Sequence, residues 1–402
     1  MDVGLGDAYA RQLEMSNLLS VRIQSVQSES KQLMHHLAKV KQQVKDATLQ
    51  TMSGNCTTID RVQFRPYRTL RGHFNKVLAL SWHPDNRHLA TAAQDGFLLY
   101  WDSVTGLKKG LIRLDDPYVI CTDISPNGHL VATGGLENAC IVYKLHSSQN
   151  AEIQQRNSIV SIFKGHKEYI SDLSFVGNSQ VLTSSGDKSI LLWDMEKGTK
   201  SVTFNGHLGD VLGLSMCPTD SNLFVSCSSD RLSNLWDIRC PLNRRQFQIS
   251  LTHDSSAVKF FPDGFSFACG TDDGELKLFD IRSDCELASY PVKMVHQHVR
   301  PHKTEELSIS DSASSLRLSR KSSMVAALDN PGVLSIDFSR SGRLLFASYA
   351  EFSSVVVWDT VMGTVVGTMD GHRDAVSAIK VSPDGLGIAT ASRDHTSRIW
   401  SV

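Results

Sequence analysis

The stretch LTSSGDKSILLWD, residues 182–194, determines the fold that this sequence predicts. Small and hydroxyl residues lead to a Gly-Asp turn, after which an apolar run ends in Trp193-Asp194. Short runs of this kind on both sides of a turn are typical of two paired β-strands. Because similar residues return in the same order along the chain, the stretch is one unit of a repeat.

Repeated endings divide most of the chain into seven units. Four endings are Trp-Asp pairs and three are weaker versions, and in chain order they are Trp101-Asp102, Tyr143-Lys144, Trp193-Asp194, Trp236-Asp237, Phe279-Asp280, Trp358-Asp359 and Trp400-Ser401. Successive endings are 42, 50, 43, 43, 79 and 42 residues apart. Apart from the longest gap, this spacing resembles that of WD40 repeats, which are about 40 to 45 residues long and form four strands each.

A fixed set of polar residues accompanies these endings. Gly-His precedes four of them, an aspartate stands six residues before five of them, and a hydroxyl residue usually stands two residues before that aspartate. On neighbouring strands such residues form a buried chain in which each polar group satisfies the next. A catalytic triad is the alternative, but a set that recurs in several units indicates a scaffold. We assign His73, Asp95, Trp101, His166, Ser185, Asp187, Trp193, His207, Ser228, Asp230, Trp236, His372, Ser392, Asp394 and Trp400 to these structural sets.

We therefore expect an all-β, seven-bladed WD40 β-propeller preceded by an N-terminal α-helix that forms a coiled coil. Residues 1–50 are assigned to the helix, 51–65 to a linker and 66–402 to the propeller, with a flexible Ser-rich insertion at about 292–331. The unit that ends at Trp400 lacks an outer strand, which would leave an open sheet edge. Residues 66–71 are predicted to supply that strand.

Some units depart from the pattern. The second unit has no Gly-His and carries Glu137 where the aspartate is expected. In the fifth unit His253 stands closer to Asp273 than the other histidines stand to their aspartates, so we do not expect it to be a structural histidine. The sixth unit has Phe352 at the aspartate position. These blades are expected to depend more on packing than on the polar chain.

The N-terminal segment carries an apolar residue at alternating steps of four and three. Eight of nine such positions are apolar over four heptads, with Ser30 as the interruption, and this pattern indicates a coiled-coil seam. The alternative is a surface helix packed on its own propeller, which usually has a wider apolar stripe. The partner-binding residues predicted on the seam are Leu19, Ile23, Val26, Leu33, Leu37, Val40 and Val44.

Composition excludes several classes of protein. The 41 basic and 42 acidic side chains nearly balance, which argues against a protein that wraps nucleic acid. No apolar run is long enough for a membrane-spanning helix, and the eight cysteines show no C-x-x-C pair, so we expect reduced core thiols and no metal site. No phosphate-binding loop or nucleophile elbow is present. We expect no enzymatic activity, no catalytic residue and no cofactor.

Several stretches resemble the β subunit of heterotrimeric G proteins beyond a general WD40 likeness. They include RTLRGHFNKV, QDGFLLYWDSVTGLK, SPNGHLVATGGLEN and GHLGDV, and the resemblance covers roughly residues 10–402. The insertion, together with FKGHKEYISDLSF and RSDCELASY, is more similar to fungal pheromone-pathway β subunits than to animal ones.

The resemblance implies a set of partners. A γ subunit binds the N-terminal helix to form an obligate βγ dimer, and GDP-bound Gα docks on one face of the propeller. Activation of Gα releases βγ to bind effectors, which in the pheromone branch include a MAP kinase scaffold and a p21-activated-type kinase, downstream of a G protein-coupled receptor. Lipid groups on γ and α would supply the membrane attachment, so we expect the protein at the cytoplasmic face of the plasma membrane and in the cytoplasm.

The resemblance also implies which residues contact Gα and effectors. The turns that follow Gly-His and those that hold the aspartates should lie at one end of the propeller, and exposed large apolar residues there are typical of anchors in an interface. The residues carried over are Lys76, Leu99, Lys108, Tyr118, Ile120, Leu136, Asn138, Tyr169, Asp210, Asp254 and Asp272. Arg393 and Leu78 replace a common tryptophan and tyrosine of the family.

The insertion carries further candidate sites. RLSRKSS places Ser319, Ser322 and Ser323 beside basic residues, as a basophilic kinase requires, and phosphorylation would add negative charge there. His296, His298 and His302 lack the Cys or carboxylate partners of a metal site.

The competing interpretation of the sequence is a different WD40 adaptor that self-associates through its helix. Examples are a co-repressor and a ubiquitin-ligase substrate receptor. A one-to-one complex with a small prenylated helical protein would favour the G protein, and a homo-oligomer would favour the adaptor.

Overall fold

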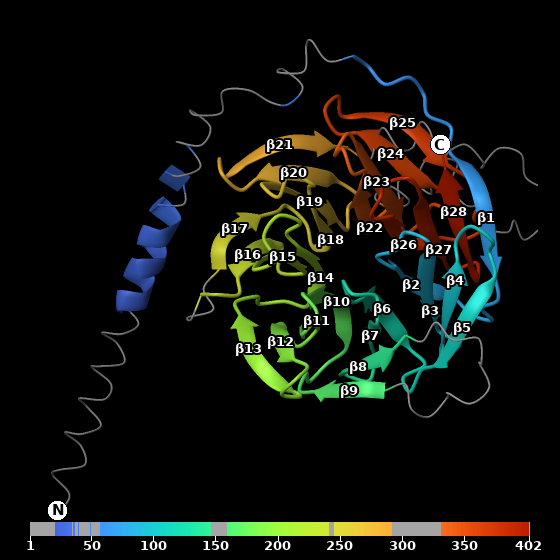
Figure 1. Ribbon diagram of the computed structural model, residues 1–402. Coiled ribbons are helices and arrows are strands. Elements are labelled where there is room, and N and C mark those ends of the chain that lie inside the picture. Colours follow the sequence, from blue (N-terminus) through green and yellow to red (C-terminus); the bar gives the residue numbers. More distant parts are fainter. Residues whose placement is uncertain are drawn as a thin grey trace, which may run out of the picture. The chain divides into compact units, whose positions relative to one another are not determined.

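The computed structural model describes residues 21–33, 35, 36, 39, 49, 57–145, 159–240, 245–291 and 331–401. The chain divides into two compact units, Met1–Met52 and Ser53–Val402. In the first unit, residues 21–33 form an α-helix. In the second, 28 strands within the described ranges form seven four-stranded antiparallel sheets arranged around an axis (Figure 1). The predicted seven-bladed propeller is confirmed.

Each blade runs from an inner strand at the axis to an outer strand at the rim. Blade 1 contains β2 (Val77–Trp82), β3 (His88–Ala93), β4 (Phe97–Asp102) and β5 (Lys108–Arg113). Blade 2 contains β6 (Val119–Ile124), β7 (Leu130–Gly135), β8 (Ala139–Lys144) and β9 (Ile159–Lys164). Blade 3 contains β10 (Ile170–Val176), β11 (Gln180–Ser185), β12 (Ser189–Asp194) and β13 (Thr199–Asn205).

The remaining blades follow the same order. Blade 4 contains β14 (Val211–Met216), β15 (Leu223–Ser228), β16 (Leu232–Asp237) and β17 (Arg245–Ser250). Blade 5 contains β18 (Ser255–Phe260), β19 (Ser266–Thr271), β20 (Leu276–Asp280) and β21 (Cys285–Tyr290). Blade 6 contains β22 (Val333–Phe338), β23 (Leu344–Tyr349), β24 (Val355–Asp359) and β25 (Thr364–Met369). Blade 7 contains β26 (Val376–Val381), β27 (Ile388–Ser392), β28 (Thr396–Ser401) and β1 (Arg65–Arg71).

Blade 7 closes the ring with strands from both ends of the propeller sequence. Strand β1 pairs antiparallel with β28, so that Arg65 lies opposite Ser401 and Arg71 opposite Thr396. The strand predicted over residues 66–71 is therefore confirmed, and the edge of β28 is covered.

The apolar cores lie between neighbouring blades. Ala90 and Leu98 of blade 1, for example, share one buried cluster with Val131 and Ile141 of blade 2. Another cluster joins blades 6 and 7 through Trp400 and its neighbours. Each blade therefore buries one face against the blade before it and the other face against the blade after it.

Side chains of the inner strands also connect each blade to its neighbour around the axis of the ring. Asp172 on β10 accepts the N–H of Leu214 on β14 at 2.9 Å, and Asp337 on β22 accepts the N–H of Val381 on β26 at 2.7 Å. These bonds satisfy backbone donors on inner edges that no fifth strand covers. The inner strands surround a central channel with a volume of about 510 Å³.

Candidate functional site

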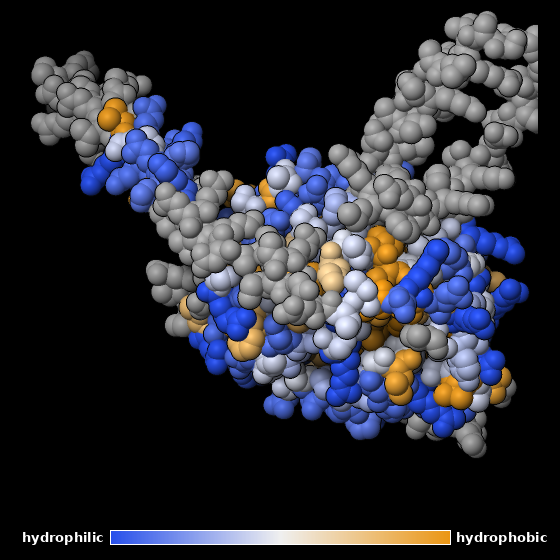
Figure 2. Space-filling view, turned by 90° about the horizontal axis from the view of Figure 1, so that it is seen from above, coloured by the Kyte–Doolittle hydropathy of each residue, from blue (hydrophilic) through white to orange (hydrophobic). Residues whose placement is uncertain are grey.

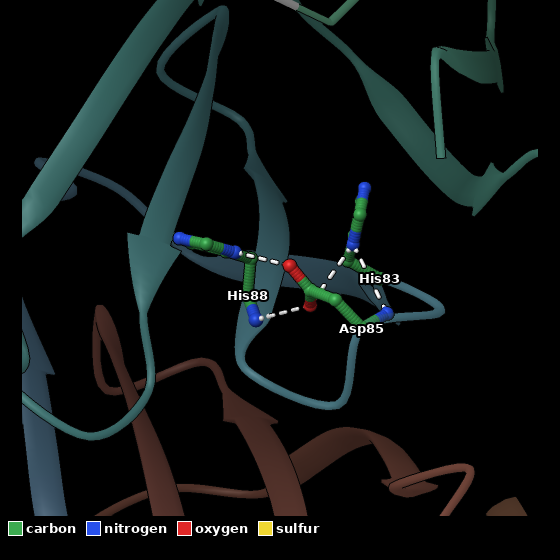
Figure 3. Close-up of side chains that lie close together, drawn as sticks. All are labelled: His83, Asp85 and His88. Carbon is green, nitrogen blue, oxygen red and sulfur yellow. Dashed lines mark hydrogen bonds and ion pairs between the residues drawn. The ribbon is translucent and has the colours of Figure 1, made fainter. Parts of the chain in front are cut away.

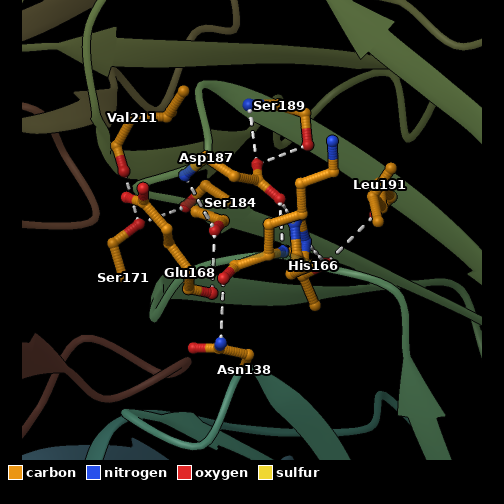
Figure 4. A network of polar contacts seen from close by, with 12 residues as sticks. Asn138, His166, Glu168, Ser171, Ser184, Asp187, Ser189, Leu191 and Val211 are labelled. Atoms are coloured by element: carbon orange, nitrogen blue, oxygen red, sulfur yellow. Dashed lines mark hydrogen bonds and ion pairs between the residues drawn. The ribbon is translucent and has the colours of Figure 1, made fainter.

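A chain of hydrogen bonds links histidine, hydroxyl, tryptophan and aspartate in blade 3, and Figure 4 shows its histidine, His166, beside Asp187. The Nδ1 of His166 lies 2.9 Å from Asp187 Oδ2, and its Nε2 lies 2.8 Å from Thr183 Oγ1. Trp193 donates its Nε1–H to the same Thr183 oxygen at 2.9 Å. Blades 1, 4 and 7 repeat this arrangement through Thr91, Ser226 and Thr390.

Burial favours the neutral form of the histidine in this arrangement. Trp193 donates to Thr183 Oγ1, His166 Nδ1 faces the Asp187 carboxylate and its Nε2 faces Thr183 Oγ1, while the Thr183 hydroxyl also lies 3.4 Å from the Leu191 carbonyl. Burial lowers the pKa of His166 and outweighs the opposing effect of Asp187. His166, Thr183 and Trp193 are all buried, and the Trp193 indole occupies the Thr183 oxygen, so no substrate can reach the hydroxyl. The arrangement therefore stabilises the blade and is not a catalytic site.

The prediction of which residues supply the hydroxyl groups of these sets is wrong. Ser185, Ser228 and Ser392 do not contact the histidine or the tryptophan. Each instead accepts the N–H of the aspartate two residues later, at 3.1 Å. In blade 3, Val181 pairs with Trp193, so the indole reaches Thr183, two residues further along the strand. Ser185 stands four residues from that pairing and belongs to the turn.

The close approach of a tryptophan ring explains why glycine precedes the histidine in the Gly-His pair. A Cβ on Gly165 would lie 2.9 Å from Cη2 of Trp193, and one on Gly206 would lie 3.0 Å from the corresponding atom of Trp236. A larger residue would push the indole away from its hydroxyl partner.

The blades that depart from the pattern are stabilised differently. In blade 2 the carboxylate of Asp116, which is 4% exposed, accepts the N–H groups of Tyr118 at 2.7 Å and Glu137 at 3.2 Å. In blade 6 Phe352 is buried and packs edge-on against Tyr349. In blade 5 the side chain of His253 is 55% exposed, unlike the buried histidines of the complete blades.

The aspartate turns and the connections after Gly-His lie at one end of the propeller, which we call the Gly-His end. The connections after Gly-His begin where an outer strand ends, and the aspartate turns join the second strand of a blade to the third. Lys76, Tyr118, Leu136 and Asp272 are exposed there, while Asn138, Tyr169, Asp210 and Asp254 are half-buried. Lys108, at the start of β5, lies over the ring of Trp101 at 5.5 Å and donates to the Gly72 carbonyl at 3.4 Å.

Direct contacts connect several of these residues across blades. Tyr169 of blade 3 donates its hydroxyl to Asp210 at 3.0 Å, and burial, with Asp210 beside it, raises the pKa of Tyr169 to about 12. Asn138 of blade 2 donates to the Lys167 carbonyl at 3.0 Å. The Gly-His end is therefore held by polar contacts between blades 2, 3 and 4.

Acidic groups gather where blades 4 and 5 meet. The backbone N–H of Asp272 donates to the Asp254 carbonyl at 2.9 Å, and Arg231 lies 3.3 Å from the Asp254 carboxylate. Burial, together with the charges of Asp254 and Asp273, raises the pKa of Asp272. This part of the Gly-His end carries a negative potential.

Two of the predicted contact residues face elsewhere. Leu99 is 2% exposed in the core shared by blades 7 and 1, so its side chain cannot contact a docking protein, and this assignment is wrong. Ile120 is half-buried and faces the central channel together with Leu78 and Arg393.

Sequence reasoning missed two exposed apolar residues at this end. Phe74 is 84% exposed and Leu208 is 79% exposed. Each follows a structural histidine, and each donates its backbone N–H to the aspartate of its blade, at 2.9 and 2.8 Å. Because this bond fixes the backbone, the side chain points to solvent. The position directly after Gly-His in the sequence would therefore have identified both residues. Viewed from the side of the ring, apolar side chains form separate patches among polar ones (Figure 2).

The helical seam is described in part. Ile23, Val26 and Leu33 are 55%, 59% and 58% exposed on the N-terminal helix. The predicted seam residues Leu19, Leu37, Val40 and Val44 lie outside the described residues, as do the insertion and the candidate phosphorylation sites Ser319, Ser322 and Ser323. Among the helical residues that the structure describes, no helix is long and apolar enough to cross a membrane.

Comparisons with known proteins agree with this architecture. A family model described as G protein beta WD-40 repeat protein matches residues 20–305, and a model for the WD domain, G-beta repeat, matches residues 363–401. A guanine nucleotide-binding protein subunit beta of Saccharomyces cerevisiae is 38% identical over 392 residues, which are 94% of this chain and 90% of the yeast protein.

Two further relatives come from a plant and an animal. The subunit beta of Arabidopsis thaliana is 35% identical over 83% of this chain and 82% of its own length. The subunit beta-5b of Danio rerio is 35% identical over 94% of this chain and 87% of its own length. With a family model that spans most of the chain and relatives aligned over nearly all of it, the chain belongs to the family of heterotrimeric G protein β subunits, which are non-enzymatic signalling proteins.

Proposed function

We propose that this β subunit forms a dimer with a γ subunit and binds GDP-bound Gα through the Gly-His end. The observation that carries the proposal is the pair formed by Tyr118 and Leu136 in blade 2. Their side chains are 52% and 54% exposed, and the Leu136 N–H donates to the Tyr118 carbonyl at 3.2 Å. Large apolar groups held by the backbone and surrounded by polar residues are typical of interface anchors.

The charges around this pair support the same use. Lys76 of blade 1 is exposed, and Asp210, Asp254 and Asp272 lie in blades 4 and 5. A partner that covers the Gly-His end would meet a basic group near blade 1 and acidic groups further round the ring. Such a distribution orients a docking protein and disfavours the wrong register.

A substitution at Leu136 tests this surface. Leu136→Arg should weaken the association of GDP-bound Gα at least about tenfold, because truncating or charging an anchor residue costs about 2 kcal/mol or more. Leu386→Arg is the matched control, since Leu386 is 80% exposed on the β26–β27 turn at the other end of the blade. The measurement is co-purification of Gα with GDP and with a non-hydrolysable GTP analogue. Equal loss in both variants, or loss in neither, would contradict the proposal.

We propose that the N-terminal helix binds γ through its apolar seam. Ile23, Val26 and Leu33 are spaced three and seven residues apart, as positions of one seam are, and all are more than half exposed. Val26→Glu should abolish co-purification of γ. Val21→Glu should not, because Val21 is 65% exposed but lies off the seam. If the chain instead forms a homo-oligomer through this seam that excludes γ, the adaptor reading is favoured.

The finer proposal is that βγ released from Gα binds a MAP kinase scaffold or a p21-activated-type kinase in a fungal pheromone response. The similarity to the yeast subunit over 94% of this chain supports a fungal-type role. Pull-down of such a kinase by βγ, blocked by added GDP-bound Gα, is the expected result. Binding that persists at saturating Gα would show that the effector uses another surface. Membrane attachment would come from lipid groups on the partners.

A further inference from the structure

The turn between β2 and β3 brings two histidines and an aspartate together. It has the sequence HPDNRH, residues 83–88, and lies at the end of blade 1 opposite to the Gly-His end. The candidate ligand atoms of His83, Asp85 and His88 all lie within 4.8 Å of one another. The Asp85 carboxylate stands between the two imidazole rings (Figure 3).

The contacts of His83 determine where its proton lies. Its Nε2 is 3.1 Å from the Gly128 carbonyl, and since a carbonyl only accepts, Nε2 carries the proton. The backbone N–H of Asp85 donates to His83 Nδ1 at 3.2 Å, so Nδ1 presents a lone pair. Asp85 Oδ1 lies 2.9 Å from that nitrogen. A carboxylate oxygen and an imidazole nitrogen at this distance can share either a proton or a metal ion.

The other contacts fix the group in place. Asp85 Oδ1 accepts the N–H groups of Arg87 at 2.9 Å and His88 at 3.0 Å, which orients the carboxylate. The His88 ring stacks on Tyr100 with centroids 5.0 Å apart, and its Nδ1 lies 2.6 Å from Asp85 Oδ2. The His83, His88 and Asp85 side chains are 18%, 22% and 37% exposed, so solvent reaches the group.

The neighbouring blade contributes to this arrangement. Gly128 on the β6–β7 turn has φ +76°, and a Cβ there would lie 2.2 Å from His83 Nε2. A glycine at this position therefore allows its carbonyl to approach the imidazole. The nearby cationic side chain, Arg87, pairs with a different carboxylate: its Nη2 lies 2.8 Å from the buried Asp102.

We propose that His83, Asp85 and His88 bind a divalent transition-metal ion, with Zn²⁺ preferred. Two imidazole nitrogens and a carboxylate oxygen are a donor set that suits zinc, and three protein ligands leave a fourth position for water. The Gly128 carbonyl would orient His83 from outside the ligand set, as such partners do in known sites. Ligand atoms about 2.0 to 2.1 Å from zinc in a tetrahedron stand roughly 3.3 Å apart, so the present 2.6 and 2.9 Å separations would open slightly.

A bound ion would fix the β2–β3 turn at the end of the propeller away from the proposed partner surface. It would hold His83 against the Gly128 carbonyl and thereby link blades 1 and 2. This inference does not depend on the proposed function.

The test is a zinc titration of the chelator-treated full-length chain by calorimetry. Because His296, His298 and His302 compete for zinc, all three are changed to glutamine in every protein tested. One Zn²⁺ per chain is expected, with a Kd below about 10 μM. His88→Gln and Asp85→Asn should each weaken binding at least about tenfold. Asp85→Asn keeps an oxygen for the N–H groups of the turn.

His395→Gln is the matched control, because His395 is exposed on the β27–β28 turn of another blade. Its affinity for zinc should equal that of the parent. Co²⁺ provides a second readout, since a tetrahedral site gives visible absorption that Asp85→Asn should remove, whereas cysteine ligands would add a near-ultraviolet band. Zinc binding that neither His88→Gln nor Asp85→Asn weakens, or a Kd above about 100 μM, would overturn the proposal.

Discussion

Blades 2 and 3 are neighbours that attach the same two segments to each other in opposite ways. In blade 3 the carboxylate is on the turn between the second and third strands, where Asp187 accepts the N–H of Lys167 in the incoming connection. In blade 2 the carboxylate is on the incoming connection, where Asp116 accepts the N–H of Glu137 in the turn. Both blades therefore have a carboxylate–N–H bond between the incoming connection and the turn between the second and third strands. Either segment can supply the carboxylate, and the other then supplies the N–H.

The strongest test of this comparison removes each carboxylate. Asp187→Ala leaves His166 and the N–H groups of Lys167 and Ser189 without their acceptor, so the free energy of unfolding should fall by about 3 to 5 kcal/mol. Asp116→Ala leaves only two N–H groups and should cost about 2 to 3 kcal/mol. Urea unfolding measures both. An equal loss would mean that the histidine chain adds nothing to the attachment.

A second test changes the same strand position in both blades. Thr183→Val removes the oxygen that His166 and Trp193 share, and should cost about 2 to 3 kcal/mol. Thr133 occupies the corresponding place in blade 2, where its hydroxyl donates to the Ile141 carbonyl at 3.4 Å. Thr133→Val should cost less than about 1 kcal/mol. Thermal unfolding of the two variants should rank them in this order, and the reverse order would refute the role of the hydroxyl.

The pH dependence of stability should come from the complete blades. Burial lowers the pKa of His166 and of His372, so the folded chain binds fewer protons there than the unfolded chain. The contribution of these two histidines to the free energy of unfolding is complete at a pH above about 6.5, the pKa of histidine in the unfolded chain. It is lost as the pH falls below that value.

Urea midpoints measured between pH 7.5 and 5.5 should therefore decrease with falling pH. His166→Asn should reduce this decrease, and His129→Asn, which changes an exposed histidine of blade 2, should not. Identical slopes for the two variants would mean that other groups control the acid response.

The smallest expected effect concerns the turn between the second and third strands. Lys188 in blade 3 has φ 69° and Asn138 in blade 2 has φ 59°, both in the left-handed region. Lysine is strained there and asparagine much less so. Lys188→Gly should raise the free energy of unfolding by about 0.5 to 1 kcal/mol, whereas Asn138→Gly should give no gain and lose the bond to the Lys167 carbonyl. A gain in both variants would show that strain is equal in the two turns.

The repeat could be read from sequence because its signals are local. The Trp-Asp endings, the Gly-His pairs and the aspartates six residues before the endings predicted seven blades and the closing strand. The hydroxyl position was misjudged because serine or threonine occurs both two and four residues before the aspartate, as Ser185 and Thr183 do. Only the pairing of Val181 with Trp193 decides between them.

The surface was less predictable than the scaffold. Leu99 was assigned by resemblance, but it lies on β4 with its side chain in the core between blades 7 and 1. Asp116 was missed because its role depends on a turn more than twenty residues later, at Glu137. The approach of His83 and His88 to Asp85 could not be predicted from the sequence, since the orientation of the two rings depends on Gly128 and Tyr100.

The pairing of β1 with β28 determines when the protein can finish folding. Strand β1 leaves the ribosome first among the strands, and its partner β28 is synthesised last. During translation the nascent chain therefore holds β1 without its partner until β28 has been made. Joining segments so far apart in sequence is slow, and unpaired strands invite aggregation in the meantime. The ring therefore stays open, with β1 unpaired, for as long as the synthesis of the propeller strands lasts.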